Sequence, residues 1–267
     1  MTFWAKTLRL FSASMQTPKP FGIFHIFFLI FSISIGLLLC RYRKNPSEKF
    51  IRIFLLLVSI MVIILEIYKQ IHFGIINAGG KGFKMHWYFF PFQFCSTPMY
   101  IGLLAAVVKK YKTHYRLCTY LATYALFAGI CVMAYPGDIY THTFGVNFQT
   151  SICHGSMITV GIFLLGSGYI KSEHRTILNA VPVFVSLVGI AMVLNEAAHL
   201  SGLTKTVEFN MFFISPYCEP YLPVYSAVQR TVPFLLCVFI YICGFTLAGY
   251  FMVLISMLFK GRKNKRI

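Results

Sequence analysis

Residues 51–72 read IRIFLLLVSIMVIILEIYKQIH, and this stretch decides the fold class. Between Arg52 and Glu66 every residue except Ser59 is apolar. One α-helix of about 20 mostly apolar residues crosses the hydrocarbon core of a bilayer, and a helix satisfies its backbone hydrogen bonds within its own segment. The stretch therefore predicts a membrane-spanning helix whose polar residues gather near its late end.

Similar apolar runs recur along the whole chain. The candidate spans are residues 20–40, 51–72, 87–108, 117–135, 149–170, 176–200 and 227–259. The sequence therefore predicts an all-α membrane protein, a seven-transmembrane helix bundle that occupies residues 19–260. Residues 1–18 are predicted to form a short amphipathic segment in the membrane interface, and residues 261–267 a basic cytoplasmic tail.

The composition leaves no room for a large soluble domain. Hydrophobic residues make up 58% of the chain and charged residues only 12%, whereas about 25% of a soluble domain is charged. The net charge of +17 sits at the ends of apolar runs, as membrane topology requires, and no basic stripe lies on a soluble helix or strand. We therefore expect membrane lipids as partners and no nucleic acid.

The basic residues also predict an orientation. Lysine and arginine concentrate in the loops 41–52, 109–116 and 171–175 and in the tail after residue 259, and these segments alternate with connections that carry few cations. Cytoplasmic loops carry the excess of lysine and arginine. With seven spans, this places the N-terminus outside the cell and the C-terminus in the cytoplasm.

Polar side chains within the spans fall at one depth in this topology, toward the outer face. They are Glu66, Gln70, His72, Gln93, Cys95, Gln149, His154, Asn195, Glu196, His199, Gln229 and Arg230. Ionisable groups inside a membrane usually mark function or pair with one another. We therefore expect a polar cavity that opens outward; the alternative is ion pairing between helices, such as Glu66 with Arg230.

Cys95 is the candidate nucleophile of this layer. Pro91 and Pro98 bracket it, and Pro98 cannot donate a hydrogen bond to the carbonyl of Phe94, which predicts a kinked helix at the cysteine. A nucleophilic cysteine needs a nearby base, and His154 lies at similar depth. The other interpretation is a buried apolar cysteine beside a packing kink, with a hydrogen-bonded structural histidine.

Residues 195–199, NEAAH, form a second constellation. Glu196 and His199 have the Glu-x-x-His spacing of carboxylate metal sites. A second copy of this motif and a His-x-x-x-His pair are both missing from the sequence, and the eight cysteines contain no Cys-x-x-Cys pair. We therefore expect no metal and no cofactor. The loop 201–225, with Pro216, Pro220 and Pro223, is either an ordinary connection or a re-entrant lid over the cavity.

Three blocks resemble the YwaF-like bacterial integral membrane proteins and their vertebrate relatives, which are transmembrane cysteine acyltransferases of ether phospholipids. The blocks are PFQFC at residues 91–95, SICHG at residues 151–155, and the loop from Gly202-Leu203 through Asn210-Met211 to its prolines. Glu66 also matches, and the likeness covers about residues 50–260. The vertebrate protein has a histidine directly after the cysteine, where this chain has Ser96.

The resemblance implies a seven-span phospholipid acyltransferase that works through a thioester. Cys95 would be the acyl-accepting nucleophile and His154 the general base. Supporting roles fall to other polar residues of the spans and the loop: Gln93, Asn195 and Asn210 as hydrogen-bond donors, Glu66 or Glu196 as the group that orients the histidine, and Arg230 as a further polar residue of the site.

Two other classes of function stay open at this stage. One is a seven-span binding, transport or receptor-like protein for a small or lipid ligand, although no inverted repeat supports a transporter. The other is a metal-dependent intramembrane hydrolase with ligands among Glu66, His154, Glu196 and His199. The family likeness favours a bacterial cytoplasmic membrane as the location.

Overall fold

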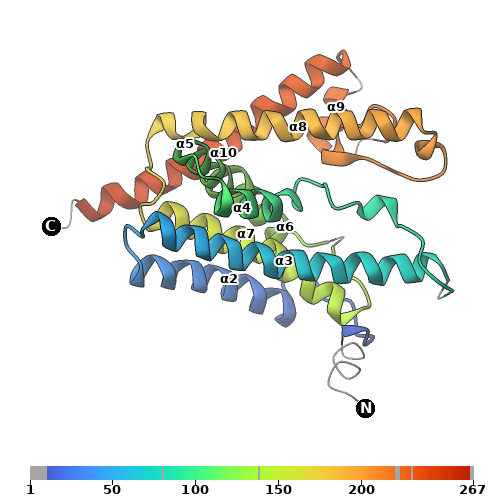
Figure 1. The fold of residues 1–267 in the computed structure, drawn as a ribbon, viewed down its shortest axis with the longest axis horizontal. Coiled ribbons are helices and arrows are strands. Elements are labelled where there is room, and N and C mark those ends of the chain that lie inside the picture. The colour runs from blue at the N-terminus through green and yellow to red at the C-terminus, as the bar shows by residue number, and fades with distance from the viewer. Residues whose placement is uncertain (1–10, 80, 138, 220–222, 230, 265–267) are drawn as a thin grey trace.

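The computed structural model describes residues 11–264 except 80, 138, 220–222 and 230, and their regular secondary structure is helical (Figure 1). Six helical stretches are long and apolar enough to cross a membrane. They are α2 (Ile23–Tyr42), α3 (Glu48–Asn77), the continuous stretch of α5 (Tyr111–Tyr120), η2 (Leu121–Ala125) and α6 (Leu126–Ala134), α7 (Phe144–Gly166), α8 (Ile177–Leu200) with η3 (His174–Thr176) before it, and α10 (Phe234–Asn264). The prediction of an all-helical, multi-pass membrane protein is confirmed.

The predicted third span, residues 87–108, is a half-helix. It consists of the short 3-10 helix η1 (Trp87–Phe89), a non-helical segment at 90–96, and α4 (Thr97–Val107). An 11-residue helix rises about 16 Å, roughly half the thickness of a bilayer core. The expected continuous helix with a kink is therefore wrong in its detail, because Pro98 lies in the first turn of α4, where its missing N–H is tolerated.

Two other boundaries differ from the sequence prediction. The last predicted span, 227–259, divides into α9 (Pro223–Gln229) and α10. The predicted interfacial segment 1–18 lies partly outside the described residues, and residues 12–18 are not helical. Ser14 instead pairs with Thr143 in an antiparallel bridge, and the Tyr68 hydroxyl donates to the Phe11 carbonyl at 2.8 Å. This segment therefore packs against the protein.

Helix α7 is the central element of the bundle. Most of its residues are buried, whereas α2, α3, α8 and α10 expose much of their apolar surface, as helices that face lipid do. Glycines let its neighbours approach closely: Gly155 faces Ser32 of α2, and Gly161 faces Leu126 of α6. Small residues at helix contacts are how membrane helices gain packing without a hydrophobic driving force.

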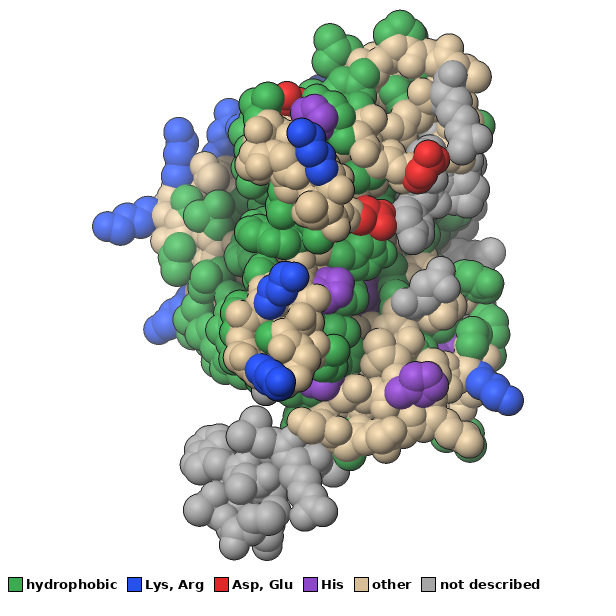
Figure 2. Space-filling model, turned by 90° about the vertical axis from the view of Figure 1, so that its right-hand side faces the viewer, with side chains coloured by type: hydrophobic (Ala, Val, Ile, Leu, Met, Phe, Trp, Pro, Cys, Tyr) green, Lys and Arg blue, Asp and Glu red, His purple; other side chains and the backbone are tan. Residues whose placement is uncertain are grey.

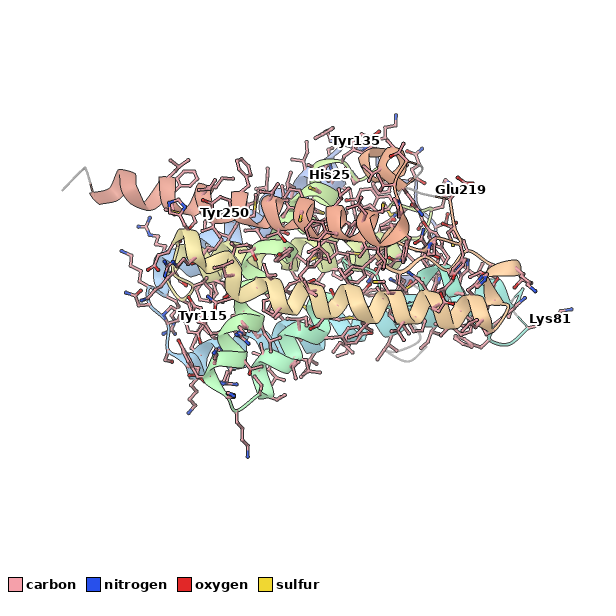
Figure 3. The ribbon with its side chains drawn as sticks, turned by 90° about the horizontal axis from the view of Figure 1, so that it is seen from above. His25, Lys81, Tyr115, Tyr135, Glu219 and Tyr250 are labelled. Atoms are coloured by element: carbon pink, nitrogen blue, oxygen red, sulfur yellow. The ribbon has the colours of Figure 1, made fainter. Side chains whose placement is uncertain are left out.

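The basic loops gather at one end of the bundle. The amide of Asn45 donates to the carbonyl of Ser167 at 2.9 Å, and Arg52 donates to the carbonyls of Ala105 and Ala106 at 3.0 and 3.1 Å. Figure 3 shows Tyr115 and Tyr250 toward this end and Lys81 and Glu219 toward the other. The described loops that the charge rule assigns to the cytoplasm therefore share one side of the molecule.

The opposite end carries the late turns of α3 and α8. Figure 2 looks onto this end and shows hydrophobic side chains exposed among histidine, lysine and a few acidic side chains. The long connections after α3 and α8 both lie here. Cys95, Gln93 and His154, three of the polar residues predicted for this layer, line one cavity of the bundle.

We expect the substitution Gly161→Ala to lower the stability of the bundle by about 1–3 kcal/mol, the usual cost of overpacking. The added Cβ would lie 2.5 Å from the Cβ of Leu126, so the two helices must separate. Thermal unfolding of the purified protein in detergent measures the effect. Gly189→Ala on α8 is the matched control, because nothing lies within 4 Å of its added Cβ; equal effects of both variants would contradict the packing argument.

Candidate functional site

A cavity of about 460 Å³ lies between α3, the segment before α4, α6, α7 and α10. Aromatic side chains are the largest group in its walls: Phe73, Tyr88, Phe89, Phe90, Phe94, Phe127, Phe213, Tyr241 and Phe245. The polar or thiol side chains among its lining are Lys69, Gln93, Cys95, Ser96, Cys131, Thr141, Thr150 and His154. The structure therefore brings the two predicted reactive residues, Cys95 and His154, to one cavity.

Cys95 lies in the non-helical segment directly before α4. The amides of Ser96 and Thr97 both donate to the carbonyl of Gln93, at 2.9 and 3.2 Å, and this turn presents the cysteine to the cavity. The Thr97 hydroxyl donates to the carbonyl of Phe94 at 2.9 Å, which satisfies the acceptor that Pro98 leaves without an amide. Cys95 is half-buried, so its thiol is held in place and remains accessible from the cavity.

His154 lies on α7, and its hydrogen bonds fix the tautomer of its ring. Nδ1 lies 2.8 Å from the carbonyl oxygen of Thr150. A carbonyl only accepts, so Nδ1 carries the hydrogen and Nε2 of the neutral ring keeps a lone pair. The Thr150 carbonyl therefore orients the ring, the role that the sequence suggested for Glu66 or Glu196. No direct hydrogen bond joins His154 to Cys95.

Glu66 is the centre of a buried polar cluster beside the cavity. Its carboxylate accepts hydrogen bonds from Gln70 at 2.7 Å and Gln149 at 3.0 Å, and pairs with the ammonium of Lys69 at 2.8 Å. The suggested partner, Arg230, lies outside the described residues. Sequence reasoning missed Lys69, although the spacing Glu-x-x-Lys on a helix is a signal for such a pair.

Gln93 and Asn195 bind the backbone of the loop after α8, at η5 (Met211–Phe213). Gln93 donates to the carbonyl of Asn210 at 3.0 Å and accepts from the amide of Phe212 at 3.1 Å. Asn195 donates to the carbonyl of Met211 at 3.1 Å and accepts from its amide at 2.8 Å. Both side-chain amides, expected as donors to substrate, are therefore used to hold the loop against the bundle.

Asn210 completes this attachment from within the loop. Its side-chain oxygen accepts from the amide of Ser215 at 2.9 Å, and its Nδ2 is buried without a hydrogen-bond partner in the described part of the chain. Phe213 reaches the cavity, and Phe212 and Phe213 both have positive φ angles, of 59° and 58°. Phe213 of this loop therefore forms part of the cavity wall.

Glu196 lies away from the cavity that holds Cys95. Its carboxylate accepts a hydrogen bond from the Tyr217 hydroxyl at 2.6 Å, and this bond raises the pKa of the Tyr217 phenol. His199 stacks on Tyr217 with 3.6 Å between ring centroids. Glu196 and Asn195 line a second cavity of about 260 Å³, which shares no lining residue with the first. This cluster anchors the loop after α8.

A second cysteine–histidine pair lies near the basic end of the bundle. The Cys118 sulfur is 3.5 Å from Nε2 of His114, which also contacts the Tyr169 hydroxyl at 2.6 Å, while Nδ1 contacts the carbonyl of Ala105 at 2.7 Å. Both side chains are fully buried, and neither lines the large cavity. The pair therefore joins α5 to its neighbours and has no access for a substrate.

The ligand set of a metal-dependent hydrolase does not assemble in the described residues, where no group of three or more histidine, cysteine or acidic side chains is arranged to hold an ion. Glu66 binds Lys69 and two glutamines, and Glu196 binds Tyr217. The side chains named for that alternative therefore have other partners.

A comparison with protein-family models matches residues 12–259 to the TMEM164 family. The chain belongs to the TMEM164 family. The match includes all six membrane-length helices, α4 and the cavity, so this TMEM164-family protein is an integral multi-pass membrane protein. Neither the curated proteins nor the solved structures contain a match. The likeness to YwaF-like bacterial proteins stays a prediction.

In this TMEM164-family protein, we expect Gln93→Leu to destabilise the attachment of the loop. The substitution leaves the Phe212 amide without a partner, at about 1–3 kcal/mol for a buried group, and leaves the Asn210 carbonyl with only the amide of Phe213, at 3.3 Å. Limited proteolysis of the loop and thermal unfolding measure the change.

Gln229→Leu is the control for Gln93→Leu, because Gln229 makes one bond, to the Ser215 carbonyl at 3.2 Å, and its own Oε1 is buried without a partner. We expect this variant to lose much less stability. Loop cleavage that is no faster in Gln93→Leu than in Gln229→Leu would contradict the role of Gln93 in holding the loop.

Proposed function

We propose that this protein is a membrane-embedded phospholipid acyltransferase in which Cys95 carries the acyl group as a thioester and His154 moves the protons. The observation that carries the proposal is the shared cavity: a half-buried thiol and a histidine with a free Nε2 line one aromatic-walled space of about 460 Å³. Membrane lipids suit such a space, because aromatic and aliphatic side chains form most of its lining and a few polar groups stand among them.

The first half-reaction transfers an acyl group to the enzyme. Nε2 of His154 takes the proton of the Cys95 thiol, and the thiolate attacks an ester carbonyl of the donor phospholipid. The tetrahedral intermediate collapses to the thioester, and the alkoxide of the departing lysophospholipid receives the proton from the imidazolium. Since no hydrogen bond joins Cys95 to His154, the proton crosses through a bridging water or after the side chains close.

The second half-reaction runs the same chemistry in reverse with a different acceptor. His154, neutral again, takes the proton from the hydroxyl of an acceptor lysophospholipid, whose oxygen attacks the thioester carbonyl. The thiolate of Cys95 departs and regains its proton from the imidazolium. Each cycle thus moves one acyl group between two phospholipids and consumes no cofactor.

The oxyanion of each intermediate needs a hydrogen-bond donor. The sequence proposed Gln93, Asn195 and Asn210, and the first two amides are bonded to loop backbone. Ser96 lines the cavity beside Cys95, within hydrogen-bonding reach of the thiol. We assign the donor role to the Ser96 hydroxyl, and Gln93, Asn195 and Asn210 serve by holding the loop that closes the cavity.

The proposal includes seven passes through the membrane, with the N-terminus outside and the C-terminus in the cytoplasm. The non-helical segment 90–96 and α4 together would make the third pass, with their irregular backbone sheltered by protein. The support is the gathering of the basic loops at one end of the bundle, as contacts between residues 45 and 167 and between Arg52 and α4 show. The thiol then opens toward the outer half of the membrane.

We expect Cys95→Ala to abolish acyl transfer and His154→Ala to lower its rate by about 10²–10⁴-fold, the range for loss of a general base. The measurement follows the transfer of a labelled acyl chain from a phospholipid to a lysophospholipid by purified protein in lipid nanodiscs. A hydroxylamine-labile acyl label on the wild type, absent in Cys95→Ala, identifies the thioester.

Cys131→Ala is the matched control for that experiment, because Cys131 lines the same cavity and has no assigned role. We expect it to keep full activity. Transfer that survives in Cys95→Ala would rule out the nucleophile. A wild type that binds lipid and transfers nothing would favour the binding or transport class.

The topology has its own test, the reaction of introduced cysteines with a membrane-impermeant maleimide in intact cells. We expect Lys81→Cys to react from outside, and Lys110→Cys to react after the membrane is opened. Lys81 lies at the end of the molecule away from Tyr115 and Tyr250 (Figure 3), and Lys110 directly precedes α5 at the basic end. Each variant keeps its native cysteines, so the labelling of the wild type is the background to subtract. The reverse pattern of labelling would contradict the proposed orientation and support the opposite one.

A further inference from the structure

We infer that Lys69 binds the phosphate of a glycerophospholipid and thereby fixes which lipids enter the cavity and where their ester bonds lie. The inference rests on the proposed lipid acyl transfer and names the residue that binds the headgroup of its substrate. It assigns a binding role to a side chain that the reaction scheme itself does not use.

Lys69 is the one lysine, arginine or acidic side chain among the described lining of the cavity. Charged side chains are costly inside a membrane and are retained where they pair or bind a ligand. The remaining walls are mostly aromatic and aliphatic. A single cation in an apolar space complements an amphipathic molecule with one anionic group, and a lysine ammonium is a standard point-charge contact for phosphate.

The pairing of Lys69 with Glu66 leaves the ammonium able to take a second anion. Glu66 also accepts hydrogen bonds from Gln70 and Gln149. These two donors continue to stabilise its carboxylate if the Lys69 ammonium moves toward the cavity. Glu66 is buried, whereas the Lys69 side chain is 15% exposed and lines the cavity. The ammonium carries three donors, enough to bridge the carboxylate and a phosphate.

The position of Lys69 along the cavity fits the arrangement of a phospholipid. Lys69 and Phe73 lie four residues apart on α3, on the face that lines the cavity, in the third of the helix nearest the outer end. Phe127 lies inside the continuous helical stretch Tyr111–Ala134, at the start of α6, Phe245 lies inside α10, and both rings belong to the apolar part of the lining. A phosphate bound at Lys69 places the acyl chains along these rings. The glycerol esters then lie between the phosphate and the acyl chains.

Cys95 lies where the ester would come to rest. It lines the cavity together with Lys69, and the ammonium is within electrostatic range of both Cys95 and His154. The ester oxygens of a glycerophospholipid are a few bonds from its phosphate. Anchoring the phosphate therefore positions the carbonyl for the thiol, and holding reactants in place supplies much of the rate of such a reaction.

The test uses full-length protein with Cys95→Ala in nanodiscs, so that no covalent chemistry is required. The probes are a phosphatidylcholine and a diacylglycerol with the same diazirine-bearing acyl chain, and the readout is labelled protein after illumination. We expect Lys69→Met to reduce labelling by the phosphatidylcholine about tenfold and to leave labelling by the diacylglycerol unchanged. Lys69→Arg, which keeps the positive charge, should restore most of the phosphatidylcholine labelling.

Two controls separate binding from folding. Lys81→Met removes a lysine from an exposed loop outside the cavity and should change neither labelling. The double variant Glu66→Gln with Lys69→Met removes both charges, so it leaves no unpaired buried carboxylate and keeps the test valid where the single variant unfolds. We expect the double variant to show the same selective loss of phosphatidylcholine labelling.

Equal loss of both labels in the folded double variant, or no loss of the phosphatidylcholine label, would overturn the assignment. Inorganic phosphate at the concentration of the lipid should leave labelling unchanged, and competition by it would identify a free-phosphate site instead. Since the experiment needs no thiol, a selective effect of Lys69 would stand even if acyl transfer through Cys95 were disproved.

Discussion

Non-helical backbone at membrane depth has to find hydrogen-bond partners within the protein, and the rest of this structure depends on how that requirement is met. The segment 90–96 forms backbone bonds of its own at its turn, where the amides of Ser96 and Thr97 donate to the Gln93 carbonyl. The loop around η5 is bonded by the side chains of Gln93 and Asn195, each with a paired donor and acceptor bond. Because Gln93 lies two residues before Cys95, the bonds that close the loop also fix the turn that carries the thiol.

The sequence predicted the parts of this protein that repeat a simple pattern. Apolar runs gave the six long helices to within a few residues at most ends, and the depth of their polar residues placed Cys95 and His154 at one level. The sequence predicted a kink in place of the break at residues 90–96. Pro98 after Cys95 is compatible both with a kink inside a helix and with the first turn of a new helix, so the sequence pattern does not separate the two. Only the bond from Thr97 to Phe94, which depends on folded geometry, distinguishes the two.

Access to the cavity, more than contact between the two side chains, distinguishes the candidate site from a structural pair. Cys118 and His114 are in direct contact at 3.5 Å, and both ring nitrogens of that histidine have partners in a sealed interior. Cys95 and His154 share no bond, yet both line an open space and Nε2 of His154 is free to act. Sequence could find neither distinction, because spacing on separate helices carries no information about which faces meet.

The partners of Glu66 explain how a buried carboxylate is stabilised beside a largely apolar cavity. A lone buried carboxylate would be strongly unfavourable, and breaking its pair would leave an uncompensated charge. Here two glutamines and an ammonium share it, and Gln70 also donates to the carbonyl of Phe89 in the wall of the cavity. The cluster thus joins α3 and α7 to η1, which directly precedes the segment that carries Cys95. A ligand that binds the Lys69 ammonium therefore perturbs its ion pair with Glu66, and Gln70 links that pair by hydrogen bonds to the chain just before Cys95.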